Sequence, residues 1–131
     1  MAGVVNQELV FEKTLSEIQI QGGQMCVSVA HHNNLLPLGQ HERVFEAICE
    51  SQHHHQFRVA FHRNGGYRKL VFTRGWTHIV REMQLQPGDI VRLYRETHHP
   101  GGQFLIFRIV FLRPITLFGS EFEAVVPLVL P

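Results

Sequence analysis

The sequence predicts a mainly β fold, a single barrel or sandwich closed at its ends by one or two short helices. Short runs of β-branched and aromatic residues recur along the chain, with glycine- and proline-containing turns between them. This pattern is typical of small β domains. With 131 residues, 44% of them hydrophobic, the chain has enough apolar material for one domain with one core.

Strands are predicted where these apolar runs occur. They are Leu9–Phe11, Val44–Cys49, Phe57–Phe61, Leu70–Phe72, Ile90–Tyr94 and Phe104–Phe111. Gly65 and Gly66 lie between two of them, and the segment from His99 to Gly102 lies between another two, so we expect hairpins with antiparallel pairing. From Leu105 to Phe111, apolar residues occupy every second position, which indicates a half-buried strand.

One segment has the period of an amphipathic helix. Its apolar positions recur at the spacing of a single helix face and are Trp76, Ile79, Val80 and Met83. Thr73 is the predicted N-cap, and Pro87 with Gly88 is the predicted stop. We expect Trp76 to be a core residue, as a lone tryptophan on an apolar helical stripe usually is.

The segment from Ser28 to Leu35 allows two interpretations. Ser28 could cap a short helix that ends before Pro37, whereas Val27 and Val29 would suit a strand equally well. Both interpretations stay open at the level of the sequence.

Charge is segregated along the chain. The interval 51–81 holds six basic residues and no acidic one, whereas the remainder holds six basic and eleven acidic residues. The formal net charge of +1 therefore hides a basic region, whose cations are Arg58, Arg63, Arg68, Lys69, Arg74 and Arg81. A concentrated positive surface attracts polyanions through counterion release, so nucleic acid is the expected partner.

The hairpin around Gly65 and Gly66 gathers the side chains best suited to this partner. Guanidinium groups can bind phosphates and guanine edges, and an asparagine amide suits adenine. The candidate DNA-binding residues of this hairpin are Arg58, His62, Arg63, Asn64, Tyr67, Arg68 and Lys69.

Two runs, VFTRGWTHIV at 71–80 and LQPGDIVRLYR at 85–95, resemble the plant B-three DNA-binding domain. That family has a strand ending in Leu-Thr, then Gly-Trp, an apolar helix, Leu-x-x-Gly-Asp and a strand ending near Arg. Phe11, Lys13 and Ser16 resemble its opening strand, Phe57 and Arg58 its aromatic-Arg pair, and 104–109 its closing strand. The segment from Met25 to Pro37 resembles its first helix.

This resemblance implies a seven-stranded open β-barrel, a DNA-binding pseudobarrel that holds the major groove between two arms. The first arm would lie near Ser16 to Gln24 and the second near Arg58 to Lys69. The first arm adds Lys13, Ser16, Gln21 and Gln24 to the candidate DNA-binding residues, although Lys13 is its one nearby cation. Residues 1–8 are then an N-terminal extension, 9–113 the domain, and 114–131 an apolar tail.

Other functions are disfavoured by the sequence. Nucleophile-elbow, phosphate-loop and His-Glu-x-x-His motifs are absent, so we expect no enzyme, cofactor, metal or small-molecule substrate. Cys26 and Cys49 form no Cys-x-x-Cys pair, and the histidine clusters are expected to be loop residues that gain charge below about pH 6.5. No apolar run reaches the roughly 20 residues that span a bilayer, which predicts a soluble, intracellular protein with no membrane partner.

The sequence therefore predicts a nuclear transcription factor that binds double-stranded DNA sequence-specifically and regulates transcription. Stronger binding would need a second copy of the chain or another transcription factor. The alternative is a degenerate barrel that binds protein or another polyanion. A restriction-type nuclease with a domain of similar fold is a third alternative, but this chain leaves no room for a nuclease half. The tail from Ile115 could add an edge strand over Phe104 and Ile106, or offer a strand to a partner.

Overall fold

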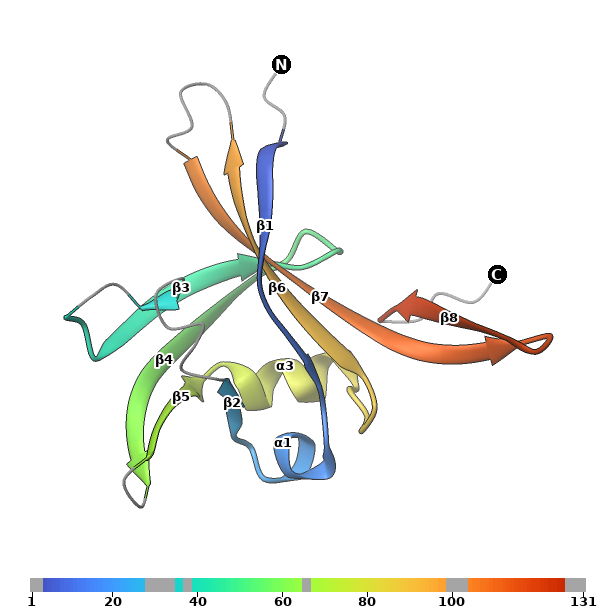
Figure 1. Ribbon diagram of the computed structural model, residues 1–131, viewed down its shortest axis with the longest axis horizontal. Helices are drawn as coiled ribbons and strands as arrows, with labels where there is room; N and C mark the ends of the chain where they lie inside the picture. The colour runs from blue at the N-terminus through green and yellow to red at the C-terminus, as the bar shows by residue number, and fades with distance from the viewer. Residues whose placement is uncertain (1–3, 28–34, 37–38, 65–66, 99–103, 127–131) are drawn as a thin grey trace.

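The fold is a curled half-barrel of strands, as Figure 1 shows, with two short helices in the described part of the chain. The computed structural model describes residues 4–27, 35–36, 39–64, 67–98 and 104–126. The strands are β1 Val4–Thr14, β2 Met25–Val27, β3 Glu42–Ile48, β4 His54–Asn64, β5 Tyr67–Arg74, β6 Ile90–His98, β7 Phe104–Leu117 and β8 Ser120–Val125. The helices are α1 Glu17–Gln21 and α3 Trp76–Met83. The predicted mainly β fold is confirmed.

Seven of these strands follow one hydrogen-bonded path, in the order β1-β6-β7-β3-β4-β5-β2, and β8 pairs with β7 off that path. Neighbouring strands are antiparallel, as expected, with one exception among the described pairs: β3 and β7 run parallel over Ala47 and Ile48. This order places β2, which follows the first arm, next to β5, which belongs to the second. The topology thus brings two distant parts of the chain together.

Alternation along the strands builds the core. Phe57 and Val59 of β4 and Phe107, Ile109 and Phe111 of β7 are buried, with more polar or exposed residues between them. The ring of Phe72 lies 5.5 to 6.4 Å, centroid to centroid, from four other aromatic rings, those of Phe11, Phe45, Phe57 and Trp76. Edge-to-face pairs of this kind contribute about 0.5–1.5 kcal/mol each beyond their buried area.

Helix α3 occupies the predicted segment and ends before the predicted stop at Pro87, but the predicted N-cap is wrong. Thr73 is part of β5, where its hydroxyl donates to the carbonyl of Arg58 at 3.3 Å, and the N-cap is Gly75. Gly75 has φ +89, and a Cβ there would lie 2.3 Å from the carbonyl oxygen of Gln56, so only glycine fits. The helix ends at Met83, before Pro87, because Gln84 takes a left-handed conformation.

The predicted strands are all present and most are longer than predicted. The turns at Gly65-Gly66 and from His99 to Gly102 lie outside the described residues, but the strands that flank each turn pair antiparallel. In the segment from Met25 to Pro37, which resembles the family's first helix, Met25–Val27 form β2, before Ser28 at the position of the family's first proline. Residues 28–34 and 37–38 are outside the described ranges, so the two interpretations of Ser28–Leu35 stay untested there.

The apolar tail does supply an edge strand, but at a different place from the one predicted. β8 pairs with residues 112–117 of β7 instead of covering Phe104 and Ile106. Strand β7 continues past Leu112, where its pairing with β6 ends, and turns back as a two-stranded hairpin. The reason is the length of β7, which extends beyond the end of β6, so the tail pairs with the C-terminal end of β7.

Candidate nucleic-acid interface

The second arm is the hairpin of β4 and β5. Buried Phe57 and Val59 of β4 and Leu70 and Phe72 of β5 fix its root in the core. From there the two strands stay paired as far as Asn64 and Tyr67, and the hairpin projects at the lower left of Figure 1. A projecting two-stranded ribbon of this kind has the dimensions that a DNA major groove admits.

Strand register decides which arm residues lie opposite one another. Arg63 pairs with Arg68 and Asn64 with Tyr67 in the backbone ladder. The side chains of residues 63–68 lie outside the described part of the structure, so for these residues the register is what is known. Nearer the root, His62 lies opposite Lys69 and both are exposed. No described carboxylate forms an ion pair with Lys69, which leaves its ammonium group available to an external anion.

Arg58, at the root of this arm, already has a partner. Its guanidinium group is ion-paired with Glu42 of β3, and its side chain remains 36% exposed. It lies opposite Arg74 of β5 in the ladder, and the two arginines line a pocket of about 200 Å³ with Glu42, Val44, Gln56 and Phe57. Arg74 is exposed. Arg74 belongs to the basic region predicted from the sequence, but it is not among the DNA-binding residues predicted there.

The first arm contains α1, a five-residue helix that was not predicted. Ser16 stands at its N-cap, where its backbone N–H and its hydroxyl both donate to Oε1 of Gln19 at 2.6 Å. The indole N–H of buried Trp76 donates to the carbonyl of Gln19 at 3.0 Å. Trp76 is a core residue, as predicted, and it also fastens the first arm to α3.

The four candidate residues of the first arm differ in availability. Ser16, Gln21 and Gln24 are exposed. Lys13 is half-buried, and its Nζ donates to the carbonyl of Cys26 at 2.5 Å. The one cation predicted for this arm is thus engaged with the β2 backbone, so the first arm offers amides and a hydroxyl more than positive charge.

Both arms project toward the same end of the molecule, the lower end in Figure 1. They are neighbours because β2 pairs with β5, with Met25 opposite Phe72 and Val27 opposite Leu70. Gly23, after α1, also lies close to Thr77 at the start of α3. The structure therefore brings the two predicted groups of site residues to adjacent positions on one end of the barrel.

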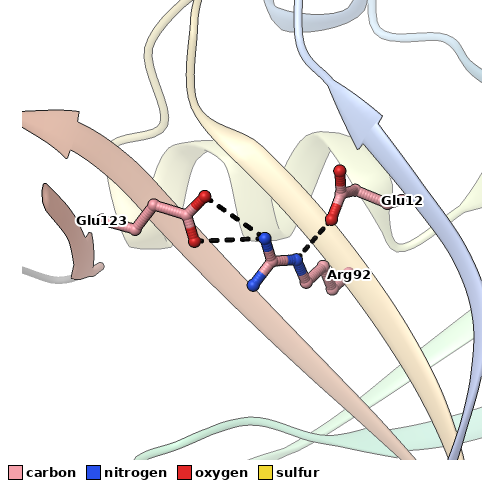
Figure 2. A network of polar contacts seen from close by, with 3 residues as sticks. All are labelled: Glu12, Arg92 and Glu123. Atoms are coloured by element: carbon pink, nitrogen blue, oxygen red, sulfur yellow. Dashed lines mark hydrogen bonds and ion pairs between the residues drawn. The ribbon is translucent and has the colours of Figure 1, made fainter. Parts of the chain in front are cut away.

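Arginines on the β6–β7 side of the barrel are internally paired. Figure 2 shows Arg92 held between Glu12 of β1, at 2.5 Å, and Glu123 of β8, at 3.1 Å. The other pairs on this side are Arg95 with Glu8 at 3.0 Å, Arg108 with Glu96 at 2.9 Å and Arg113 with Asp89 at 2.8 Å. These arginines are consequently less available to an outside partner than Lys69 or Arg74.

The histidine cluster at 53–55 lines a second pocket, of about 430 Å³, together with Gln56, Gly75, His78 and Glu82. His54 pairs with Glu46 and His78 with Glu82, whereas Nε2 of buried His55 has no hydrogen-bond partner in the described part of the chain. Burial lowers the pKa of His55 below its usual 6.5. Within the described ranges, no three His, Cys, Asp or Glu side chains are grouped so as to hold a metal ion.

Comparison with known proteins identifies the fold. A family model described as the B3 DNA binding domain matches residues 11–110. The chain belongs to the B3 DNA-binding domain family. No curated protein matches the sequence. Among solved structures, the Arabidopsis FUS3–DNA complex is similar, with a TM-score of 0.60 and 16% identity over 78% of this chain and 96% of that chain. The B3 pseudobarrel, predicted from the sequence, is confirmed.

No helix in the described ranges is both long enough and apolar enough to span a membrane. Both cysteines are free thiols, with Cys49 buried and Cys26 half-buried.

Proposed function

We propose that this B3 protein is a nuclear transcription factor that binds double-stranded DNA sequence-specifically, and that it acts through binding, not catalysis. One observation carries the proposal: two adjacent arms project from one end of a B3 barrel, and the longer arm lies in the part of the sequence that has no acidic residue. A duplex is the partner that matches a cationic ribbon in both charge and width.

In this proposal the β4–β5 arm enters the major groove. Lys69, Arg63 and Arg68 contact phosphates and guanine edges, while His62, Asn64 and Tyr67 add polar contacts that read bases or fix the register. Arg58 contributes once a phosphate competes with Glu42 for its guanidinium group. The binding unit in this proposal is the segment 9–113, which contains all of these residues.

The first arm takes a supporting role. Ser16, Gln21 and Gln24 can donate to phosphates, and glutamine can read adenine through two hydrogen bonds. Lys13 acts by holding the arm against β2 through Cys26. With so little positive charge on this arm, we expect modest affinity for the single chain, and regulation of transcription would then depend on a second DNA-binding module or a partner protein.

The test begins with selection of bound duplexes from a random pool, followed by titration of the winning duplex at two salt concentrations. If about four cations neutralise phosphates, the slope of log K against log salt is about −3.6. Replacing Arg63, Arg68 and Lys69 together by alanine should flatten that slope to about −0.9. Arg81→Ala, at an exposed arginine on α3 that belongs to neither arm, is the matched control and should leave the slope unchanged.

The alternative, a barrel that binds protein or another polyanion, rests on the weak charge of the first arm. It would be supported by the absence of duplex binding at low salt, or by binding that survives the triple substitution. Equal affinity for all duplexes in the pool would instead retain DNA binding and remove sequence specificity.

A further inference from the structure

The hairpin formed by residues 113–125, hereafter the β7–β8 extension, is unusually apolar on its surface. Leu117 and Phe122 are each 51% exposed, Val125 is 43% exposed and Phe118 is fully exposed. These four are the majority of the seven large hydrophobic side chains that are exposed in the described part of the chain. Clustered exposed apolar residues of this kind mark an interaction site more often than scattered ones do.

The extension lies outside the part of the chain that makes it a B3 domain. The family model ends at residue 110, before the extension begins. In Figure 1 the extension projects to the right, away from the lower end where the two arms lie. The extension therefore lies apart from the arms that are proposed to contact DNA.

Strand pairing sorts the side chains of the extension onto two faces. Ile115 lies opposite Phe122 and Leu117 lies opposite Ser120, so one face is mainly apolar. Thr116 lies opposite Glu121, and Glu123 and Val125 are on the same face as Glu121. An isolated two-stranded ribbon with an uncovered apolar face is marginally stable in water, so a third strand would stabilise it.

The tip of the extension holds a residue that the fold itself does not explain. Phe118 has φ +52 and Gly119 has φ +79, the signs of a two-residue type I′ turn. Asparagine or glycine is usual at the first position, and a bulky residue there costs on the order of 1 kcal/mol. Since the Phe118 side chain is fully exposed, no contact within the described structure offsets this cost.

The root of the extension, by contrast, is firmly held. Arg92 bridges Glu123 of β8 to Glu12 of β1, as Figure 2 shows. Arg113 makes two hydrogen bonds to buried Asp89, at 2.8 and 2.9 Å. The extension is therefore pre-organised for binding, which lowers the entropic cost of ordering it on association.

Charge narrows the choice of partner. Glu123 is neutralised by Arg92, whereas exposed Glu121 has no ion-pair partner among the described residues, so the uncompensated charge of β8 is negative and would not attract a phosphate backbone. Pairing of β8 with a second copy, centred on Phe122, would place Glu121 of one chain opposite Glu123 of the other, so it would supply no cation for the unpaired Glu121. An approaching strand in which lysine or arginine alternates with apolar residues could place a cation beside Glu121 and an apolar side chain beside Phe122.

We propose that the free edge of β8 is a docking site for an extended segment of another protein, in which basic residues alternate with apolar ones. Among the described strands, β8 pairs with β7 alone, so its outer edge has backbone N–H and C=O groups available for strand addition. Glu121, for which the described residues supply no ion-pair partner, binds a cation of the added strand, and Phe122 packs against an apolar neighbour.

The probe is a blocked peptide of about seven residues in which lysine and valine alternate, titrated against the full chain without DNA. We expect binding with slowed hydrogen exchange at the β8 backbone amides. A peptide N-methylated on the pairing edge keeps the side chains but loses the hydrogen bonds, and should bind at least about tenfold more weakly.

Two variants test the surface itself. Phe122→Ser and Glu121→Lys change exposed side chains, and each should weaken binding of the lysine–valine peptide by about tenfold. Glu121→Lys should in addition strengthen binding of a peptide in which glutamate and valine alternate. Leu9→Ser, at a side chain 48% exposed on the edge strand β1, is the matched control and should bind the peptide normally. Duplex binding should be unchanged in all three variants.

Three outcomes would overturn the docking proposal. One is no binding of the lysine–valine peptide at millimolar concentration. Another is equal binding of the N-methylated peptide, which would show charge attraction without strand addition. The third is a concentration-dependent doubling of mass that Phe122→Ser abolishes, because this would assign the edge to a second copy of the chain.

Discussion

Arginine side chains stand on two hairpins of this barrel, β4–β5 and β6–β7, and their surroundings differ. On β6–β7, Arg92, Arg95 and Arg108 each meet a carboxylate of a described strand. On β4–β5, Arg58 has an acidic partner, Glu42, whereas Lys69 and Arg74 have none in the described ranges. The sequence between Glu50 and Glu82 contains no acid, so the β4–β5 hairpin has none of its own to neutralise its cations.

This difference separates charge that stabilises the fold from charge that can serve a partner. A paired, partly buried arginine contributes less to binding an incoming phosphate, because its existing ion pair must first be broken. An exposed, unpaired lysine has no such cost. Counting basic residues along a sequence therefore overestimates the cations available for DNA, and pairing in the tertiary structure corrects the count.

The largest expected effect comes from breaking the most buried ion pair of the β6–β7 side. Arg113→Ala leaves the carboxylate of Asp89, 1% exposed, without its two guanidinium hydrogen bonds. We expect the free energy of unfolding, measured by urea denaturation, to fall by about 3–5 kcal/mol. Lys69→Ala is the contrasting variant: its stability should stay within about 0.5 kcal/mol of the wild type while DNA binding weakens.

If Arg113→Ala proved as stable as the wild type, the backbone N–H of Gln86, which donates to Asp89 at 2.8 Å, would be sufficient to hold the carboxylate. The Arg113–Asp89 pair, the most buried of the compared pairs, would then contradict the distinction between arginines that stabilise the fold and arginines available to a partner.

A smaller effect is expected from freeing the paired arginine of the β4–β5 arm. Glu42→Gln removes the acid that pairs with Arg58, so one more cation becomes available to phosphate. Duplex affinity at about 0.1 M salt should rise several-fold, and the salt slope should become more negative by about 0.9. The measurement is the same two-salt titration used for the wild type.

Glu46→Gln provides the control for this substitution. Glu46 lies on the same strand, β3, and pairs with His54 instead of an arginine. Its replacement should leave the salt slope unchanged. A rise of equal size in both variants would show a general effect of net charge, with no specific role for the Arg58–Glu42 pair.

The smallest expected effect concerns the pH dependence of stability, through the buried imidazole of His55. Burial lowers the pKa of His55 in the folded chain below 6.5. As pH falls below 6.5, the unfolded chain binds this proton more readily than the folded chain, so stability present above pH 6.5 is lost. His55→Phe should reduce the loss of unfolding free energy between about pH 7.5 and 5.5, measured by urea denaturation.

Exposed His53, the neighbour of His54, offers the matched control for this pH dependence. His53→Gln should show the wild-type loss of stability in acid. If His55→Phe showed it unchanged as well, other groups would account for the acid sensitivity.

Local patterns in the sequence were sufficient for the framework of the fold. Apolar residues alternate from Leu105 to Phe111, and those of α3 recur at helical spacing from Trp76 to Met83. Each pattern shows which side of the element faces the core, and it can be recognised from residues only a few positions apart. The family motif around Gly75 and Trp76 is also short in sequence. Its glycine is needed for the turn before α3, and its tryptophan is needed for packing in the core.

Contacts between distant residues were beyond such patterns. The sequence pattern predicts the helix boundary at Thr73, whereas the observed boundary at Gly75 depends on the nearby carbonyl of Gln56. The position of β8 depends on how far β7 extends past β6. The anchoring of α1 depends on a hydrogen bond between Trp76 and Gln19, 57 residues apart.

The sequence by itself determined the B3 barrel, the core helix and the acid-free interval that makes the second arm cationic. Only the tertiary structure decided which charges remain available, because partners such as Arg92 and Glu12 are 80 residues apart. Ion pairing is a property of distances in space, and the sheet order that brings β1 beside β6 and β2 beside β5 sets those distances.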